Sequence, residues 1–171
     1  MEWVHLSMRA VHVVLGSFWV GTVLFAMLYL DPAVREAGAD GGRVMGILLR
    51  RGYLRTILLV GAVVVLSGVY LLWTLSGGFS AGFMGSASGI LISTGGLAGI
   101  LALLVGAHVS LPTARKLGEL GRQLAESGGG APAQDELDEM AHLRRKLTRA
   151  LRTAGILLLV AILSMALGPH V

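Results

Sequence analysis

Histidine and methionine are the side chains of this sequence best suited to holding a metal, because the chain contains no cysteine. Three of the five histidines, His5, His12 and His170, fall near one end of the apolar segments, together with Met8 and Met165. Imidazole and thioether ligands in combination suit soft or borderline metals such as Cu(I), or haem iron with His/His or His/Met ligation. The pattern therefore predicts a metal or haem site at this end of the molecule.

His12 is the strongest candidate ligand of this group. It falls inside the first apolar segment, where an imidazole without a partner is costly and an ionisable residue indicates a functional site by default. Arg9 lies one helical turn away and is suited to binding the propionates of a haem at the membrane surface. The remaining members have a simpler interpretation, as solvated or packing residues, which we favour: His5, His170, Met8 and Met165.

His108 lies near the opposite end of the third apolar segment. At 1.5 Å per helical residue, His12 and His108 differ in depth by roughly 20 Å, so they cannot ligate the same haem. Asp31, at the end of the first segment, is expected at the depth of His108. We therefore favour a structural His108–Asp31 pair over a metal-ligand role for His108.

The composition indicates an integral membrane protein. Hydrophobic residues make up 54% of the 171 residues and charged residues only 14%, whereas soluble domains carry roughly 25% charged residues. The basic residues flank apolar runs instead of forming a basic face with interleaved aromatics, so the expected partner is the lipid bilayer and not nucleic acid. The sequence contains no phosphate-binding loop, and we expect neither a hydrolase nor a kinase.

Four apolar runs have the length of about 20 residues with which a helix crosses a bilayer. The first run is expected to end at Asp31-Pro32 and the third at Pro112, because proline disfavours helix at the preceding residue. Residues 112–146 are expected to form a helical extension interrupted by a flexible linker at 127–132. We predict an all-α, single-domain membrane four-helix bundle with spans at about 10–30, 56–75, 89–111 and 147–167.

The distribution of basic residues predicts the orientation of the bundle. The first loop holds five arginines and the third holds eight lysines and arginines, from Arg115 to Arg152, whereas the second loop holds none. By the positive-inside rule, the first and third loops are cytoplasmic and both termini lie on the outer side. The expected location is the inner (cytoplasmic) membrane, with multiple spans.

Small residues recur at a spacing of four, as Ser17 and Gly21 in the first span and Gly95 and Gly99 in the third. This spacing permits close approach of two helices. Packing inside one bundle is the favoured interpretation, and a homodimer interface is the alternative.

The segment His12 to Gly21, HVVLGSFWVG, resembles the first-helix signature of the CopD-like membrane proteins, in which a His is followed by Trp-x-Gly near the middle of the helix. The end of the third span, Gly106-Ala107-His108, resembles the same group and the related HemJ-type protoporphyrinogen oxidases. The four spans, the basic cytoplasmic loop and the Arg-rich start of the last span also agree, so the resemblance covers most of the chain.

The resemblance implies b-type haem binding through His12, or copper handling, a weaker role for His108, and often a homodimer. HemJ-type proteins carry a lysine at the outer end of the third helix as a second haem ligand. This chain has Ser93, Thr94, Gly95 and Gly96 there. The difference weakens the case for protoporphyrinogen oxidation.

Three functions remain open: a haem b protein of electron transfer or redox chemistry, a copper transport or tolerance protein, and a structural subunit of a larger complex. We favour haem, because a Cu(I) route through the membrane requires several Met or Cys ligands and this chain offers little more than Met27 and His108. If the chain is an enzyme, we expect an oxidoreductase. A redox partner protein or a quinone is then the expected electron donor or acceptor.

Overall fold

The computed structural model describes residues 2–126 and 133–170, and the predicted linker at 127–132 lies outside them. The described residues form helices and turns, with no strand among them. The helical elements are, in chain order, α1 (Glu2–Phe25), η1 (Ala26–Leu30), α2 (Asp31–Glu36), α3 (Gly38–Arg50), α4 (Tyr53–Leu75), α5 (Ala81–Met84), α6 (Ala87–Val105), η2 (Gly106–Ser110), α7 (Leu111–Glu126), α8 (Gln134–Leu167) and η3 (Gly168–His170).

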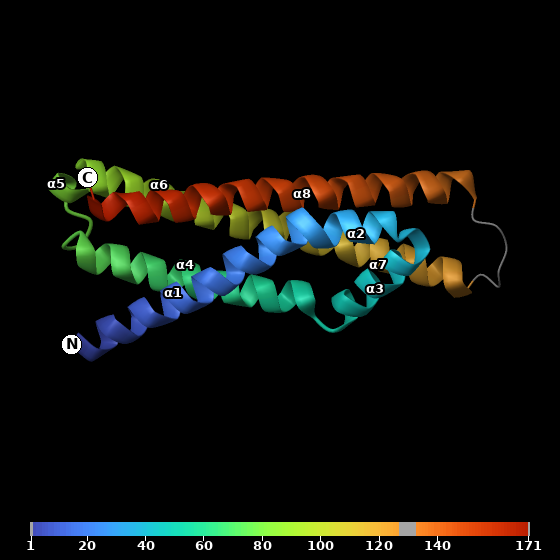
Figure 1. Ribbon diagram of the computed structural model, residues 1–171, viewed down its shortest axis with the longest axis horizontal. Coiled ribbons are helices and arrows are strands. Elements are labelled where there is room, and N and C mark those ends of the chain that lie inside the picture. The colour runs from blue at the N-terminus through green and yellow to red at the C-terminus, as the bar shows by residue number, and fades with distance from the viewer. Residues whose placement is uncertain (1, 127–132, 171) are drawn as a thin grey trace.

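Four of the helical stretches are long and apolar enough to cross a membrane. They cover Glu2–Glu36, Tyr53–Leu75, Ala87–Leu124 and Gln134–His170, and each contains one of the predicted spans. The prediction of an all-α four-helix bundle of membrane type is therefore confirmed. The two termini lie at the same end of the bundle, which we call the terminal end, and α2, α3 and α7 lie at the opposite, basic end (Figure 1).

The bundle consists of two antiparallel helix pairs, α1 with α4 and α6 with α8 (Figure 1). The core lies where the pairs meet, and its most deeply buried side chain is Leu158 of α8, which is 1% exposed. Trp19 of α1 and two alanines, Ala102 and Ala154, complete this contact. Small residues on α6 and α8 let their backbones approach closely, which suits association in lipid, where packing provides much of the stabilisation.

The two prolines do not end their helices, and the predicted ends at Asp31-Pro32 and Pro112 are wrong. The first long helix continues to Glu36 and the third continues as α7. Each proline follows a five-residue π-helical segment, η1 or η2, at the same spacing. A proline ring clashes with the carbonyl four residues earlier, and the wider π turn provides the room for it. The helix therefore bends past the proline without breaking.

The helical extensions predicted for the third and fourth spans are present as α7 and the first turns of α8. An ion pair of 2.5 Å between Lys116 and Glu139 joins them. The helix α3 was not predicted, because its four glycines obscure an amphipathic pattern. Gly41 is required there, since a Cβ at this position would lie 2.1 Å from the backbone oxygen of Val34 in α2.

Candidate functional site

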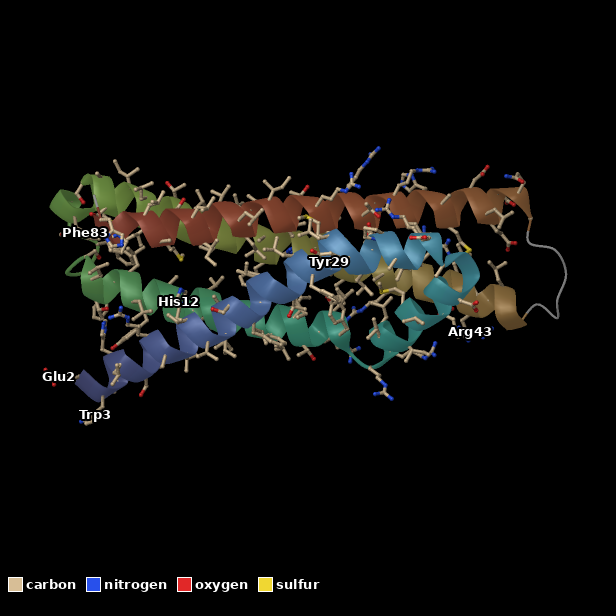
Figure 2. The ribbon with its side chains drawn as sticks, in the orientation of Figure 1. Glu2, Trp3, His12, Tyr29, Arg43 and Phe83 are labelled. Carbon is tan, nitrogen blue, oxygen red and sulfur yellow. The ribbon has the colours of Figure 1, made fainter. Side chains whose placement is uncertain are left out.

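His12 lies between α1 and α4, half-buried, with its ring held against the α4 backbone (Figure 2). Its Nδ1 atom lies 2.9 Å from the carbonyl oxygen of Val64 and 3.2 Å from the hydroxyl oxygen of Ser67. Gly68 makes this approach possible, because a Cβ there would lie 2.8 Å from Cε1 of His12. The ring is thus held by a carbonyl and a hydroxyl oxygen, and it fits against α4 because Gly68 has no side chain.

The acceptors around His12 determine which ring nitrogen carries the proton. A carbonyl oxygen only accepts, so Nδ1 donates to Val64. The Ser67 hydroxyl lies within hydrogen-bonding distance of the carbonyl oxygens of Val63, at 2.8 Å, and Val64, at 3.0 Å, so its proton is directed to the backbone and its oxygen accepts from Nδ1. In a neutral His12, the lone pair therefore resides on Nε2. A metal-bound histidine has this arrangement, with the second ring nitrogen donating to a backbone carbonyl.

A seven-residue spacing on α1 matches a similar spacing on α4. Nδ1 of His5 lies 3.4 Å from the Thr74 hydroxyl, which itself donates to the Leu71 carbonyl. Seven residues after His12, Trp19 packs on Gly61, where a Cβ would lie 2.8 Å from the indole ring. Each of the three α1 side chains therefore meets a small or hydroxyl residue of α4, and the two histidines lie about 10 Å apart along the helix. At that separation, the two histidines of one chain cannot both ligate the same haem iron.

Arg9 and Met8 lie on the outside of α1 near His12. Both are exposed, and Met8 retains 37% of its accessible surface. Arg9 forms no ion pair with the residues that the structure describes, so its guanidinium remains available to an anionic group. The roles assigned to Arg9 and Met8 stay predictions.

Met165 and His170 belong to the other helix pair. Met165 lies against α6, where its Cγ would be 3.0 Å from a Cβ on Gly95. His170 is exposed in η3, and the preceding Gly168 packs on Ile92 of α6. The N-terminal half of α1 diverges from the end of α8 (Figure 1). The structure thus associates both residues with α6, and gives His12 no second ligand within the described part of this chain.

The expected pair of His108 and Asp31 is not formed. His108 is exposed, and its Nδ1 lies 3.2 Å from the Leu104 carbonyl of its own helix. Asp31 instead accepts hydrogen bonds from Arg35 at 2.5 Å and from Thr148 of α8 at 3.1 Å. A local arginine and a hydroxyl from the facing helix satisfy the carboxylate, so it needs no imidazole.

Gly68 and the Val64 carbonyl are the parts of the site that the sequence analysis missed. Ser67 was expected only to bond its own helix backbone, which it does in addition to accepting from His12. The signal in the sequence was the Ser-Gly pair at 67–68, which lies on α4 beside His12 of the antiparallel helix α1. The register between the two helices was needed to use this signal.

Comparison of the chain with known protein families, curated proteins and solved structures gives no match. In the part of the chain that the structure describes, no group of three or more His, Cys, Asp or Glu side chains is arranged to hold a metal ion. The site consists of one well-positioned imidazole and a nearby cation. A metal held here would need its other ligands from a macrocycle or from another molecule.

Proposed function

We propose that this protein binds haem b in the membrane, where Nε2 of His12 would be the ligand that the chain supplies to the iron, and that it serves electron transfer. The supporting observation is the hydrogen bond from Nδ1 of His12 to the Val64 carbonyl. This bond orients the imidazole and leaves Nε2 as the basic nitrogen, and it also raises the basicity of the ligand. A porphyrin would supply the other ligands of the iron, so one histidine from the chain would suffice to hold the haem.

The residues around His12 fit the edge of a haem. Arg9, about one helical turn before His12 on the exposed side of α1, would provide a cation for a propionate. The bound haem would supply one-electron chemistry, and the chain would hold and orient it and exclude water from its apolar edge. A redox partner protein or a quinone would exchange the electron.

Absorption spectroscopy of the purified protein, expressed with ample haem supply, tests this proposal. We expect a haem b spectrum in the wild type and its loss in the His12→Ala variant. His108→Ala, at the basic end, is the matched control and should retain the haem. Circular dichroism and the elution volume in detergent establish that each variant keeps the helical bundle. Addition of free imidazole to His12→Gly should restore haem binding, which a purely structural role for the histidine does not predict.

The coordination state of the iron tests the ligand set within the same experiment. With His12 as the one ligand from the chain, we expect a five-coordinate, high-spin reduced haem that binds carbon monoxide. A low-spin, six-coordinate spectrum would require a second ligand, and Met165→Leu and His5→Ala would then distinguish a thioether from an imidazole of a second copy. Wild-type protein without haem would refute the proposal and leave copper handling or a structural role.

A further inference from the structure

A basic hollow of about 540 Å³ opens between α8 and the junction of α6 with η2, at the end of the molecule opposite His12. Four basic side chains of α8 line it, at a spacing that places them on one helix face. They are His142, Arg145, Lys146 and Arg149. The opposite wall consists of Val105 and Val109.

The cations of this basic hollow have no anionic partner in the part of the chain that the structure describes. The ion pair nearest in sequence uses Glu139, which binds Lys116 of α7. Asp31, which contacts α8 through Thr148, is paired with Arg35. Three permanent positive charges therefore face a single concavity, an arrangement that suits a phosphate-bearing anion.

A second, apolar hollow of about 570 Å³ continues from the first, and the two share Val105 and Val109. The wall of this apolar groove is extended by leucines of α6 and α8, namely Leu101, Leu104 and Leu157. Leu101 and Leu104 keep 42% and 45% of their surface exposed. Leu157 lies eight residues beyond Arg149, or about 12 Å further along α8 toward the terminal end.

The depth of the two hollows matches the two parts of a phospholipid. The basic hollow lies at the boundary between the charged turns of α8 and its apolar run, which begins at Ala154. This boundary is expected at the level of the lipid headgroups. The apolar groove lies deeper, among the residues that span the hydrocarbon. We infer that the basic hollow binds the phosphate of an anionic phospholipid, with one acyl chain along the apolar groove.

The charge of the basic hollow also indicates which lipids it prefers. Three permanent cations exceed the single charge of a one-phosphate headgroup such as phosphatidylglycerol. A lipid with two phosphates, such as cardiolipin, neutralises more of them and should bind more tightly, whereas zwitterionic phosphatidylcholine should bind most weakly.

Native mass spectrometry of the detergent-purified protein, titrated with these three lipids, tests the inference. The variant Arg145→Gln/Arg149→Gln should lower the affinity for cardiolipin about 30-fold, at roughly five-fold for each cation lost. The matched control, Arg50→Gln/Arg51→Gln, removes two cations from the basic end outside the basic hollow and should change the affinity less than about two-fold, well below the roughly 30-fold loss expected for the first variant. An equal loss in both variants would reduce the effect to general surface charge and overturn the site.

A groove-filling variant separates a lipid from a phosphate ion in solution. Leu104→Trp leaves the charge unchanged and should weaken cardiolipin binding about ten-fold or more, which corresponds to losing the contact of about two buried methylenes. Inorganic phosphate should fail to displace the lipid at equal concentration. Full binding in Leu104→Trp, with displacement by inorganic phosphate, would identify a soluble anion as the ligand and refute the lipid assignment. Elution volume and circular dichroism verify that each of these variants folds. The outcome is independent of haem binding at His12.

Discussion

The contact between Gly68 and His12 predicts a specific coupling between α4 and α1. In Gly68→Ala, the new Cβ would lie 2.8 Å from Cε1 and 3.3 Å from Nδ1 of the ring. The ring must retreat by about 0.6 Å to reach the 3.4 Å of an ordinary contact, which lengthens the 2.9 Å bond to Val64 toward the limit of a hydrogen bond.

The expected cost of Gly68→Ala follows from three contributions. Overpacking costs about 1–3 kcal/mol and a weakened hydrogen bond about 0.5–1.5 kcal/mol, while alanine gains up to about 1 kcal/mol in helix propensity. We expect a net loss of about 0.5–4.5 kcal/mol in the free energy of unfolding. Gly21→Ala is the matched control, because nothing lies within 4 Å of a Cβ there, and it should be neutral or stabilising.

Unfolding in detergent micelles, followed by tryptophan fluorescence and circular dichroism, measures this cost. The decisive comparison is the double variant His12→Ala/Gly68→Ala. Without the imidazole, the methyl group introduced on α4 meets no ring, so adding Gly68→Ala to His12→Ala should cost no more than Gly21→Ala. If the cost of Gly68→Ala persists in the His12→Ala background, the residue acts through α4 alone and the described packing of the ring is refuted.

Two further predictions concern helix packing and topology. Gly95→Ala should destabilise the protein by about 1–3 kcal/mol, because its Cβ would lie 2.9 Å from the Ala161 backbone oxygen, whereas Gly96→Ala, with nothing within 4 Å of its Cβ, should be tolerated. Equal unfolding curves for the two variants would contradict the close α6–α8 contact. An unchanged mass of Gly95→Ala in detergent would assign Gly95 to packing within one chain. From the charge asymmetry of the loops, a cysteine at Gly118 should resist an impermeant reagent in intact cells while one at Glu2 reacts; the reverse result would invert the proposed orientation.

The length and composition of the apolar runs predicted the four spans, because lipid requires about 20 apolar residues per helix whatever the packing. The helices extend beyond those runs for local reasons. In α8, the Glu136 side chain accepts from the backbone N–H of Ala133 at 3.0 Å, which caps the polar first turn. The effect of Pro32 and Pro112 was mispredicted because the rule for α-helix does not describe a π turn, whose wider ring accommodates the proline.

The candidate site shows that the depth of each residue in the membrane does not by itself predict which side chains contact one another. Counting residues along a helix gave the depth of His12, Met165 and His170 and grouped them at one level. Depth leaves the direction of each side chain around its helix undetermined, and that direction follows from which helices pair. Gly68 admits the imidazole of His12 to the α1–α4 contact, and Gly95 admits Met165 to the α6–α8 contact.

The glycines thus determine which side chains can meet. Once the His12–Ser67 contact is known, the seven-residue spacing places His5 at Thr74 and Trp19 within one residue of Gly61. Met165 lies in the other helix pair, where its Cγ would be 3.0 Å from a Cβ on Gly95 of α6. Among the described residues, no side chain of the same copy is placed to be a second ligand of a haem at His12, so a second copy or a small molecule is the expected source, and the spin state of the iron is the measurement that tests this expectation.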